Sequence, residues 1–335
     1  MAVTRHVTRR LASAVATTAT IAMTLSACGG TDSPGSAGGA SVAANGSTAI
    51  AVGNGPFLSN VDLHLSSSKG YFAEAGLTAD IKVLTAGSNA VPQLLNNSMQ
   101  FAAVDVSTAI TAVAQHLPIE VVAPNTVGSS GKVGYAGVVV SPQSGITSPA
   151  GLVGKTVAVN QINGTAMVLT KAALAKDGVD WTKVKFTEVA PPQLLPTLTA
   201  GRSDGAVLGE PGVTAAVSQK MTYLLNLEQN TVPGAVTFVY ITSKAYASKN
   251  PEVVKSFASA VLKGHVYANA HPNEVRTLAL ASTEIPAELL AKVTLPTFGE
   301  KAVEAQEIDT WIALLEQYGG FDKSKAPTAA AVLGQ

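Results

Sequence analysis

Few residues in this chain have the types and the spacing that catalysis or metal binding requires. The sequence contains a single cysteine and five histidines. The four histidines beyond the N-terminal region show no H-E-x-x-H pattern or paired spacing, so we expect surface or helix-packing residues instead of zinc ligands. No G-x-S-x-G sequence is present, so a serine-elbow hydrolase would lack its nucleophile. We therefore expect a protein with no catalytic residue, no cofactor and no metal; the histidines concerned are His64, His116, His265 and His271.

Gly154-Lys155-Thr156 resembles the end of a phosphate-binding P-loop. Pro149 takes the position of the first glycine of that pattern, and the segment leads into an expected strand instead of opening a helix. ATP binding is therefore not expected.

Polar, mostly uncharged side chains follow several expected strands, and hydrogen bonding to a small molecule is the chemistry they offer. Sheets of α/β proteins bind small ligands at the carboxyl ends of their parallel strands, where loop amides and helix N-termini point outward. Phe57 either stacks on a ligand ring or fills core, and Asp105 and Glu210 either accept from a ligand N–H or cap backbone groups. The predicted ligand-binding residues are Asn54, Pro56, Phe57, Ser88, Asn89, Asp105, Ser107, Thr108, Asn160, Gln161, Asn163, Thr165 and Glu210.

Helix capping is the alternative role for part of this set. Ser88-Asn89 and Gly164-Thr165 each precede a helix-forming stretch, and an N-cap contributes about 1 kcal/mol of stability. Capping alone can explain individual positions, whereas joint contact with a ligand better explains the set.

Short apolar runs of β type alternate with helix-length segments along most of the chain. This alternation predicts a mostly parallel sheet with crossover helices. The pattern restarts after Thr147-Ser148-Pro149 and becomes mainly helical past Tyr240, where residues 251–268 have the spacing of a long amphipathic helix. The expected strands are Thr48–Val52, Ala79–Leu84, Phe101–Val104, Ile119–Ala123, Val133–Val140, Thr156–Val159, Val184–Glu188, Gly205–Leu208 and Thr222–Leu227.

An ungapped internal repeat links two parts of the chain, since residues 92–104 align by residue class with residues 196–208. In both, a proline opens a short helix, Asn97 or Gly201 ends it with a residue tolerant of positive φ, and an apolar strand follows. Two similar α/β halves are implied. Chance similarity is the alternative, because helix–turn–strand joints share this pattern.

Charged residues are few and balanced. The chain has 22 Lys and Arg against 22 Asp and Glu, is 47% apolar, and carries only Arg202 and Arg276 as arginines beyond the N-terminal region. No basic stripe is present of the kind that nucleic-acid backbones require, so nucleic acid is not an expected partner. The predicted ligand loops contain no Arg or Lys, which favours a neutral or amine-bearing ligand over nitrate or a sulfonate. Helix N-termini and Lys132 leave an anion as the alternative.

The N-terminus has the features of a secretory signal peptide. Arg5, Arg9 and Arg10 precede an apolar stretch, residues 11–27, that is too short and too weakly apolar for a stable membrane span.

The end of this stretch, Leu25-Ser26-Ala27-Cys28, resembles the lipobox of bacterial lipoproteins. The resemblance implies that the Cys28 thiol is diacylated, with palmitate-type chains, and becomes the lipid anchor and new N-terminus after cleavage. An ordinary cleavage site with Cys28 left as a free thiol is the alternative. Residues 29–47 are rich in Gly, Ser, Ala and Thr, a composition typical of a flexible tether.

Further segments resemble one family, the extracytoplasmic solute-binding proteins of ABC importers. The similar branch includes nitrate, sulfonate, taurine and thiamine-pyrimidine-precursor binders (NMT1/SsuA-like). The resemblance covers about Ile50–Ile241 in order. The segments that carry it are Lys69–Leu77, similar to K-G-Y-F-x-x-x-G-L; Leu152–Val159, similar to L-x-G-K-x-V; Ala200–Ala206; and Gly209-Glu210-Pro211.

The resemblance implies an α/β fold of the two-lobed, type II periplasmic-binding-protein kind. Each lobe is then a mostly parallel sheet flanked by helices, and the lobes close on a ligand about a hinge. The chain is expected to cross between lobes near Val138–Pro142 and to return near Thr237–Ser243. The expected parts are a signal peptide (1–27), a lipidated cysteine and tether (28–47), lobe one (48–139), lobe two (140–240), and the return to lobe one with the C-terminal helices (241–335).

The function implied is that of a monomeric receptor, lipid-anchored to the membrane on its extracytoplasmic face. It would capture a small polar organic solute and deliver it unchanged to an ABC permease and its ATPase. A sensor or adhesin without transport is one alternative. A second is an enzyme similar to the pyrimidine synthases of thiamine pathways, with His64 near the cleft.

Overall fold

The computed structural model describes residues 41–42, 46–55, 58–84, 89–129, 131, 133–229, 231–282 and 285–335. All of these residues belong to one compact unit, Ala37–Gln335. Within the described ranges, no helix is long and apolar enough to cross a membrane.

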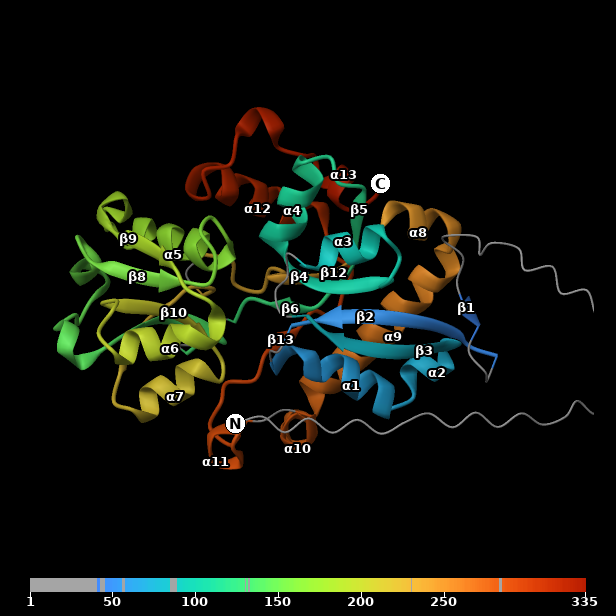
Figure 1. Cartoon of the computed structure of the whole chain (residues 1–335), viewed down its shortest axis with the longest axis horizontal. Helices are drawn as coiled ribbons and strands as arrows, with labels where there is room; N and C mark the ends of the chain where they lie inside the picture. The colour runs from blue at the N-terminus through green and yellow to red at the C-terminus, as the bar shows by residue number, and fades with distance from the viewer. Residues whose placement is uncertain are drawn as a thin grey trace, which may run out of the picture. The chain divides into compact units, whose positions relative to one another are not determined.

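Two sheets organise this unit (Figure 1). The first sheet has the strand order β1-β2-β4-β12-β5, with β3 paired to β2. Its strands are β1 (Ser41–Val42), β2 (Thr48–Asn54), β3 (Leu77–Val83), β4 (Phe101–Asp105), β5 (Ile119–Pro124) and β12 (Phe238–Ser243). The second sheet has the order β11-β7-β10-β8-β9, built from β7 (Ala136–Val140), β8 (Thr156–Val159), β9 (Lys185–Glu188), β10 (Gly205–Gly209) and β11 (Thr222–Asn226).

Helices cover both faces of the first sheet. Along β4, Phe101 and Ala103 face one buried layer, while Ala102 and Val104 face the other, the period of two that a strand buried on both sides requires. Helices α1, α2 and α9 pack on the first layer, and α3, α4, α12 and α13 on the second (Figure 1). The helices of this part are α1 (Val61–Ser68), α2 (Tyr71–Glu74), α3 (Ala90–Leu95), α4 (Val106–Ala114), α8 (Lys244–Lys249), α9 (Pro251–Ala270), α10 (Pro272–Ser282), α11 (Ala287–Leu290), α12 (Ala305–Tyr318) and α13 (Ala329–Val332).

The second sheet is covered in the same way. Leu194, Leu198 and Val213 from α6 and α7 pack on one face, and Met167 and Val168 from α5 pack on the other. These helices are α5 (Thr165–Lys176), α6 (Pro191–Thr199) and α7 (Gly212–Ser218). Short 3-10 helices also occur in both parts of the unit: η1 (Leu58–Asn60), η3 (Pro142–Ser144), η4 (Pro149–Leu152), η5 (Trp181–Lys183) and η6 (Lys323–Lys325).

The two segments that connect the sheets run side by side. Strand β6 (Thr126–Val127) pairs with β13 (Thr297–Phe298), and Val127 also forms an antiparallel bridge with Val236. The amide of Gly128 donates to the carbonyl of Ala235 at 2.8 Å. A Cβ on Gly128 would collide with the carbonyl oxygen of Val232, so glycine is required for this close approach.

The predicted two-lobed α/β class is confirmed, and each expected strand corresponds to an observed one. Most strands of each sheet run in one direction, as predicted, but each sheet also contains strands that run antiparallel to them. Strand β12 was not expected as a strand, and it lies antiparallel between β4 and β5; β7 is likewise antiparallel to β10 and β11. The chain reaches each of these strands directly from the other sheet, without a crossover helix. The rule that a crossover helix joins parallel strands therefore does not apply to them.

The crossing between the sheets also lies earlier than expected. The sequence places it at Val138–Pro142, but Ala136–Val140 already pairs within the second sheet. An apolar run has the same appearance in either sheet, and its pairing partner is not visible in the pattern.

The repeat is confirmed in its positive-φ turn, with φ of 59° at Asn97 and 66° at Gly201. The expectation that each of these prolines opens its helix is wrong. Pro92 lies inside α3, which begins at Ala90, and Pro196 lies inside α6, which begins at Pro191. The backbone N–H that proline lacks would have no partner within the helix in the first turn, so Pro92 is tolerated just after the start of α3.

Candidate functional site

Four predicted residues meet in one hydrogen-bonded cluster that joins the two sheets. Asp105 ends β4 of the first sheet, and Thr165 begins α5 beside the second sheet. The Thr165 hydroxyl donates to Asp105 Oδ1 at 2.8 Å and lies 3.0 Å from Ser107 Oγ. Asp105 also accepts from the Ser107 hydroxyl and from the Thr108 hydroxyl at 2.8 Å. We call these four residues the Asp105 cluster.

Capping explains one member of this cluster and not another. Asp105 is the N-cap of α4 and accepts from the backbone N–H of Thr108 at 3.1 Å. The N-cap residue of α5 is Gly164, which has no side chain. Thr165 follows it, and its hydroxyl donates to Asp105 at the end of β4 instead of capping α5. Asn89, at the N-cap of α3, makes no side-chain capping bond. Asp105 therefore caps a helix with its side chain, whereas Asn89 and Thr165 do not.

Glu210 forms a second contact between the two parts of the unit. Its buried carboxylate accepts from the amide of Thr214 at 3.0 Å, from the Thr214 hydroxyl at 2.7 Å, and from the amide of Thr294 at 3.0 Å. Thr294 follows Val293, which packs with Val61 of α1 beside the first sheet. A buried carboxylate with three donors is well satisfied, so Glu210 both caps α7 and holds the segment before β13 against the end of β10.

The remaining predicted residues do not join this cluster. Asn54 is buried at the end of β2, and its Nδ2 has no hydrogen-bond partner among the described residues. Asn160, Gln161 and Asn163 are exposed in the loop between β8 and α5. Pro56, Phe57, Ser88 and the proposed anchor Cys28 lie outside the described residues.

Sequence reasoning missed Glu228 and Tyr135, which lie on the connecting segments. Glu228 is 6% exposed, and its Oε2 accepts from the amide of Ser129 at 2.8 Å. Burial raises the pKa of Glu228 to about 6, and the Ser129 N–H opposes that rise. Both residues lie at strand ends: Tyr135 directly precedes β7, and Glu228 lies two residues past the end of β11. The strand-end argument would have found Glu228 had it been applied to the strand at 222–226.

A buried polar network supports α1 beneath this region. Asp62 Oδ2 accepts from Asn125 Nδ2 at 3.0 Å and from the Tyr240 hydroxyl at 2.6 Å, and it lies 2.9 Å from His265 Nε2. The other ring nitrogen of His265 lies 2.7 Å from the carbonyl oxygen of Gly299. His265 is thus a helix-packing residue, as expected, and the network fixes α1 against α9 and β12. Burial, followed by the charge of Asp62, raises the pKa of Tyr240.

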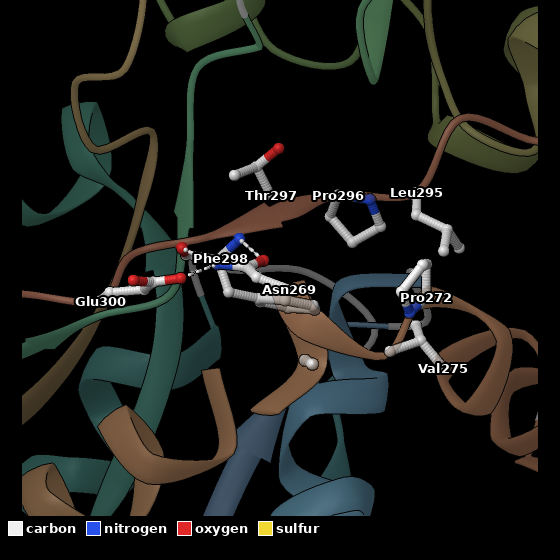
Figure 2. Close-up of a pocket in the computed structure, with 9 residues that line it drawn as sticks. Asn269, Pro272, Val275, Leu295, Pro296, Thr297, Phe298 and Glu300 are labelled. Atoms are coloured by element: carbon white, nitrogen blue, oxygen red, sulfur yellow. Dashed lines mark hydrogen bonds between the residues drawn. The ribbon is translucent and has the colours of Figure 1, made fainter. Parts of the chain in front are cut away.

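Two surface cavities lie away from these residues. A cavity of about 360 Å³ opens between the end of α9, α10 and β13. Figure 2 shows Pro272, Val275, Leu295 and Pro296 along its apolar wall, while Asn269 Nδ2 donates to Glu300 Oε1 at 2.9 Å. Another, of about 700 Å³, lies along α2 and α9. Neither is lined by a predicted ligand-binding residue.

Comparison with known proteins identifies relatives of this chain. A family model described as NMT1/THI5 like matches residues 62–275. The taurine-binding periplasmic protein of Escherichia coli is 30% identical over 201 residues, which cover 60% of each chain. The formylaminopyrimidine-binding protein of Halalkalibacterium halodurans is 27% identical over 235 residues, or 66% of each chain. The matches thus span about 60% and 66% of the length of these curated relatives.

Solved structures share this fold over most of the chain. The alkanesulfonate-binding protein SsuA from Xanthomonas axonopodis has a TM-score of 0.67 at 18% identity, covering 85% of this chain and 96% of that one. The periplasmic nitrate-binding protein NrtA from Synechocystis has a TM-score of 0.61 at 15% identity, covering 78% and 74%. At this identity the likeness establishes the fold, a two-lobed binding-protein fold in which each sheet described above is the core of one lobe.

Proposed function

The chain belongs to the NMT1/THI5-like family, and from this premise we propose that it is the solute-binding lipoprotein of an ABC importer. It captures a small polar organic solute of the nitrate, sulfonate, taurine or pyrimidine-precursor class and delivers it unchanged to a membrane permease and its ATPase. Relatives named for binding taurine and formylaminopyrimidine support this proposal.

The Asp105 cluster is the observation that supports binding between the lobes most directly. Asp105 and Ser107 come from lobe one, and Thr165 comes from lobe two. Polar groups that touch each other only when the lobes are together can also be bridged by a ligand, which then favours the closed state by its differential affinity for it. The closed state is the form that a permease would recognise.

The lobes proposed here are residues 48–125 with 238–335, and residues 129–234, because β7 pairs within the second sheet and β12 within the first. The paired connecting segments at 126–128 and 235–237 form the hinge. Residues 1–27 serve as signal peptide, Cys28 carries the lipid on the extracytoplasmic face, and the segment up to residue 47 is the tether. The receptor acts as a monomer.

No chemistry on the solute is part of this proposal. The Asp105 cluster offers three hydroxyls and a carboxylate. Among the described residues, the Asp105 carboxylate is the one base hydrogen-bonded to these hydroxyls, and it already caps α4. A sensor without transport would bind its solute between the same two lobes and would differ only in its protein partner.

Thermal unfolding of Ala37–Gln335 with candidate solutes tests the proposal. The panel contains taurine, alkylsulfonates, nitrate, amines, nucleobases and thiamine pyrimidine precursors. A ligand at one hundred times its dissociation constant adds about 2.7 kcal/mol of stability, which raises the midpoint clearly. A rise with one chemical class is expected, and an unchanged midpoint with every compound would contradict the proposal.

A further inference from the structure

Helix α12 of lobe one ends against lobe two. It packs both on α4 of its own lobe and on α5 of the other lobe (Figure 1). The last carbonyl groups of a helix have no partners within the helix, and the helix dipole places partial negative charge there. Helix α12 has no basic residue in its own last turn. A cation supplied by another element is therefore favoured at this end.

Lys171 of α5 supplies this cation from lobe two. Its Nζ donates to the carbonyl oxygen of Tyr318, the last residue of α12, at 2.8 Å. The same Nζ lies 5.0 Å from the centre of the Trp181 ring and 5.8 Å from that of the Phe186 ring, both in lobe two. The Trp181 ring meets the Tyr318 ring edge-on, with 5.7 Å between the ring centres. We call Lys171, Trp181 and Tyr318 the α12 latch.

The environment of Lys171 makes its contact with α12 important. Burial lowers the pKa of Lys171, and no acidic group of the described residues opposes this effect. A partly buried ammonium group without a carboxylate loses hydration, so its remaining contacts must compensate. A charge-assisted hydrogen bond and a cation–π contact do so best where water is excluded. Separation of the lobes would remove the hydrogen bond to α12 and leave only the contacts within lobe two.

The α12 latch lies apart from the hinge. The first half of α12 holds the returning segment of the hinge, because Glu307 Oε1 accepts from the amide of Val236 at 2.9 Å and Trp311 Nε1 donates to its carbonyl at 2.6 Å. Tyr318 lies about 10 Å farther along the helix than Trp311, at 1.5 Å per residue. A rotation of the lobes about the hinge therefore moves α5 relative to the end of α12.

We propose that Lys171 is a positioning residue for solute capture, which holds the lobes together through the α12 latch and so raises solute affinity from outside the cleft. The proposal rests on the function proposed above and adds a determinant of affinity to it. Lys171 lies on the same helix as Thr165, whose hydroxyl contacts Asp105 in the other lobe. A contact made only in the closed state increases the fraction of closed protein, and the apparent affinity rises with that fraction.

Small-angle X-ray scattering and calorimetric titration of Ala37–Gln335 together test this inference. Lys171→Met keeps the length of the side chain and removes its charge and its donor. Without solute, this variant is expected to have a larger radius of gyration than the parent. With taurine or formylaminopyrimidine, whichever the parent binds, its affinity should be weaker by about fivefold or more. At saturation with that compound, its radius of gyration should return to that of the parent.

Two further variants separate the latch from general damage to α5. Lys171→Arg keeps the charge and a donor, so its radius of gyration should match that of the parent and its affinity should stay within about twofold. Lys176→Met removes an exposed lysine from the last turn of the same helix and should match the parent in both measurements.

Equal radii of gyration for the ligand-free parent and Lys171→Met, with the unfolding midpoint preserved, would overturn the inference. An unchanged affinity of Lys171→Met for a compound that the parent binds would overturn it as well, and so would an equal loss of affinity in Lys171→Arg. A parent that binds neither compound would count against the proposed function, whereas the ligand-free scattering comparison would still decide whether Lys171 holds the lobes together.

Discussion

Individual hydroxyl and carboxyl groups carry the contacts between the lobes. Asp105 and Thr165 are separated by 60 positions in the chain and still lie within hydrogen-bonding distance. Both were predictable as strand-end residues, because position relative to a strand is visible in the pattern. Their pairing was not predictable, since it depends on how the second lobe is oriented. Glu228 also follows a predicted strand and could have been found in the same way, but its burial arises from the packing of the connecting segments and was not predictable.

The Thr165→Val variant tests the Asp105 cluster at this scale. Valine keeps the shape of threonine and removes the hydroxyl that contacts Asp105 and Ser107. A net hydrogen bond contributes about 1 kcal/mol, so solute affinity should fall roughly fivefold to tenfold. Calorimetric titration measures this, with exposed Thr310→Val on α12 as control. Parent-like affinity in Thr165→Val would remove the cluster from the binding mechanism.

Glu228 also makes the stability of the ligand-free protein depend on pH. Because its pKa rises from 4.5 to about 6 on folding, its protonated form is favoured in the folded state. Its contribution is fully present below pH 4.5 and is lost as the pH rises through 6. The shift corresponds to about 2 kcal/mol. The free energy of unfolding of the parent, relative to that of Glu228→Gln, should therefore fall by about that amount between pH 4.5 and pH 7. Urea unfolding at the two pH values measures this, and a constant difference would contradict the raised pKa of Glu228.

Strands and helices were largely predictable because both periods appear in the sequence. The short, continuous apolar run of β4 and the amphipathic spacing of α9 each identify their element. The place of β12 was not predictable, since an apolar run beginning at Phe238 fits either a strand or the start of a buried helix. Its neighbours β4 and β5 lie more than a hundred residues earlier, and such pairing has no local signature.

The connecting segments make their own prediction. Gly128→Ala introduces a Cβ that collides with the backbone carbonyl of Val232, and the overpacking should cost about 1–3 kcal/mol. Gly212→Ala is the control, because its nearest neighbour, Leu208 Cβ, is 3.7 Å from the added atom. Urea unfolding should show a loss for Gly128→Ala alone. Equal stability of the two variants would show that the segments are not in close contact.

At the scale of the whole molecule, the account joins a membrane anchor to a two-lobed binding unit. The anchor is a proposal from Leu25–Cys28. Cys28→Ala should abolish incorporation of labelled palmitate and release the protein from the membrane fraction, whereas Ser26→Ala should retain the label. A Cys28→Ala protein that still carried the acyl label would reject the anchor without affecting the binding unit.

The central claim is that the two lobes capture one small polar solute and return it unchanged. Equilibrium dialysis of Ala37–Gln335 against the mixed panel, followed by mass spectrometry of the retained material, tests it most directly. The account predicts one compound retained at about one per chain, with its mass unaltered after release, and reduced retention by Thr165→Val. Retention of nothing, or recovery of a chemically altered compound, would contradict it.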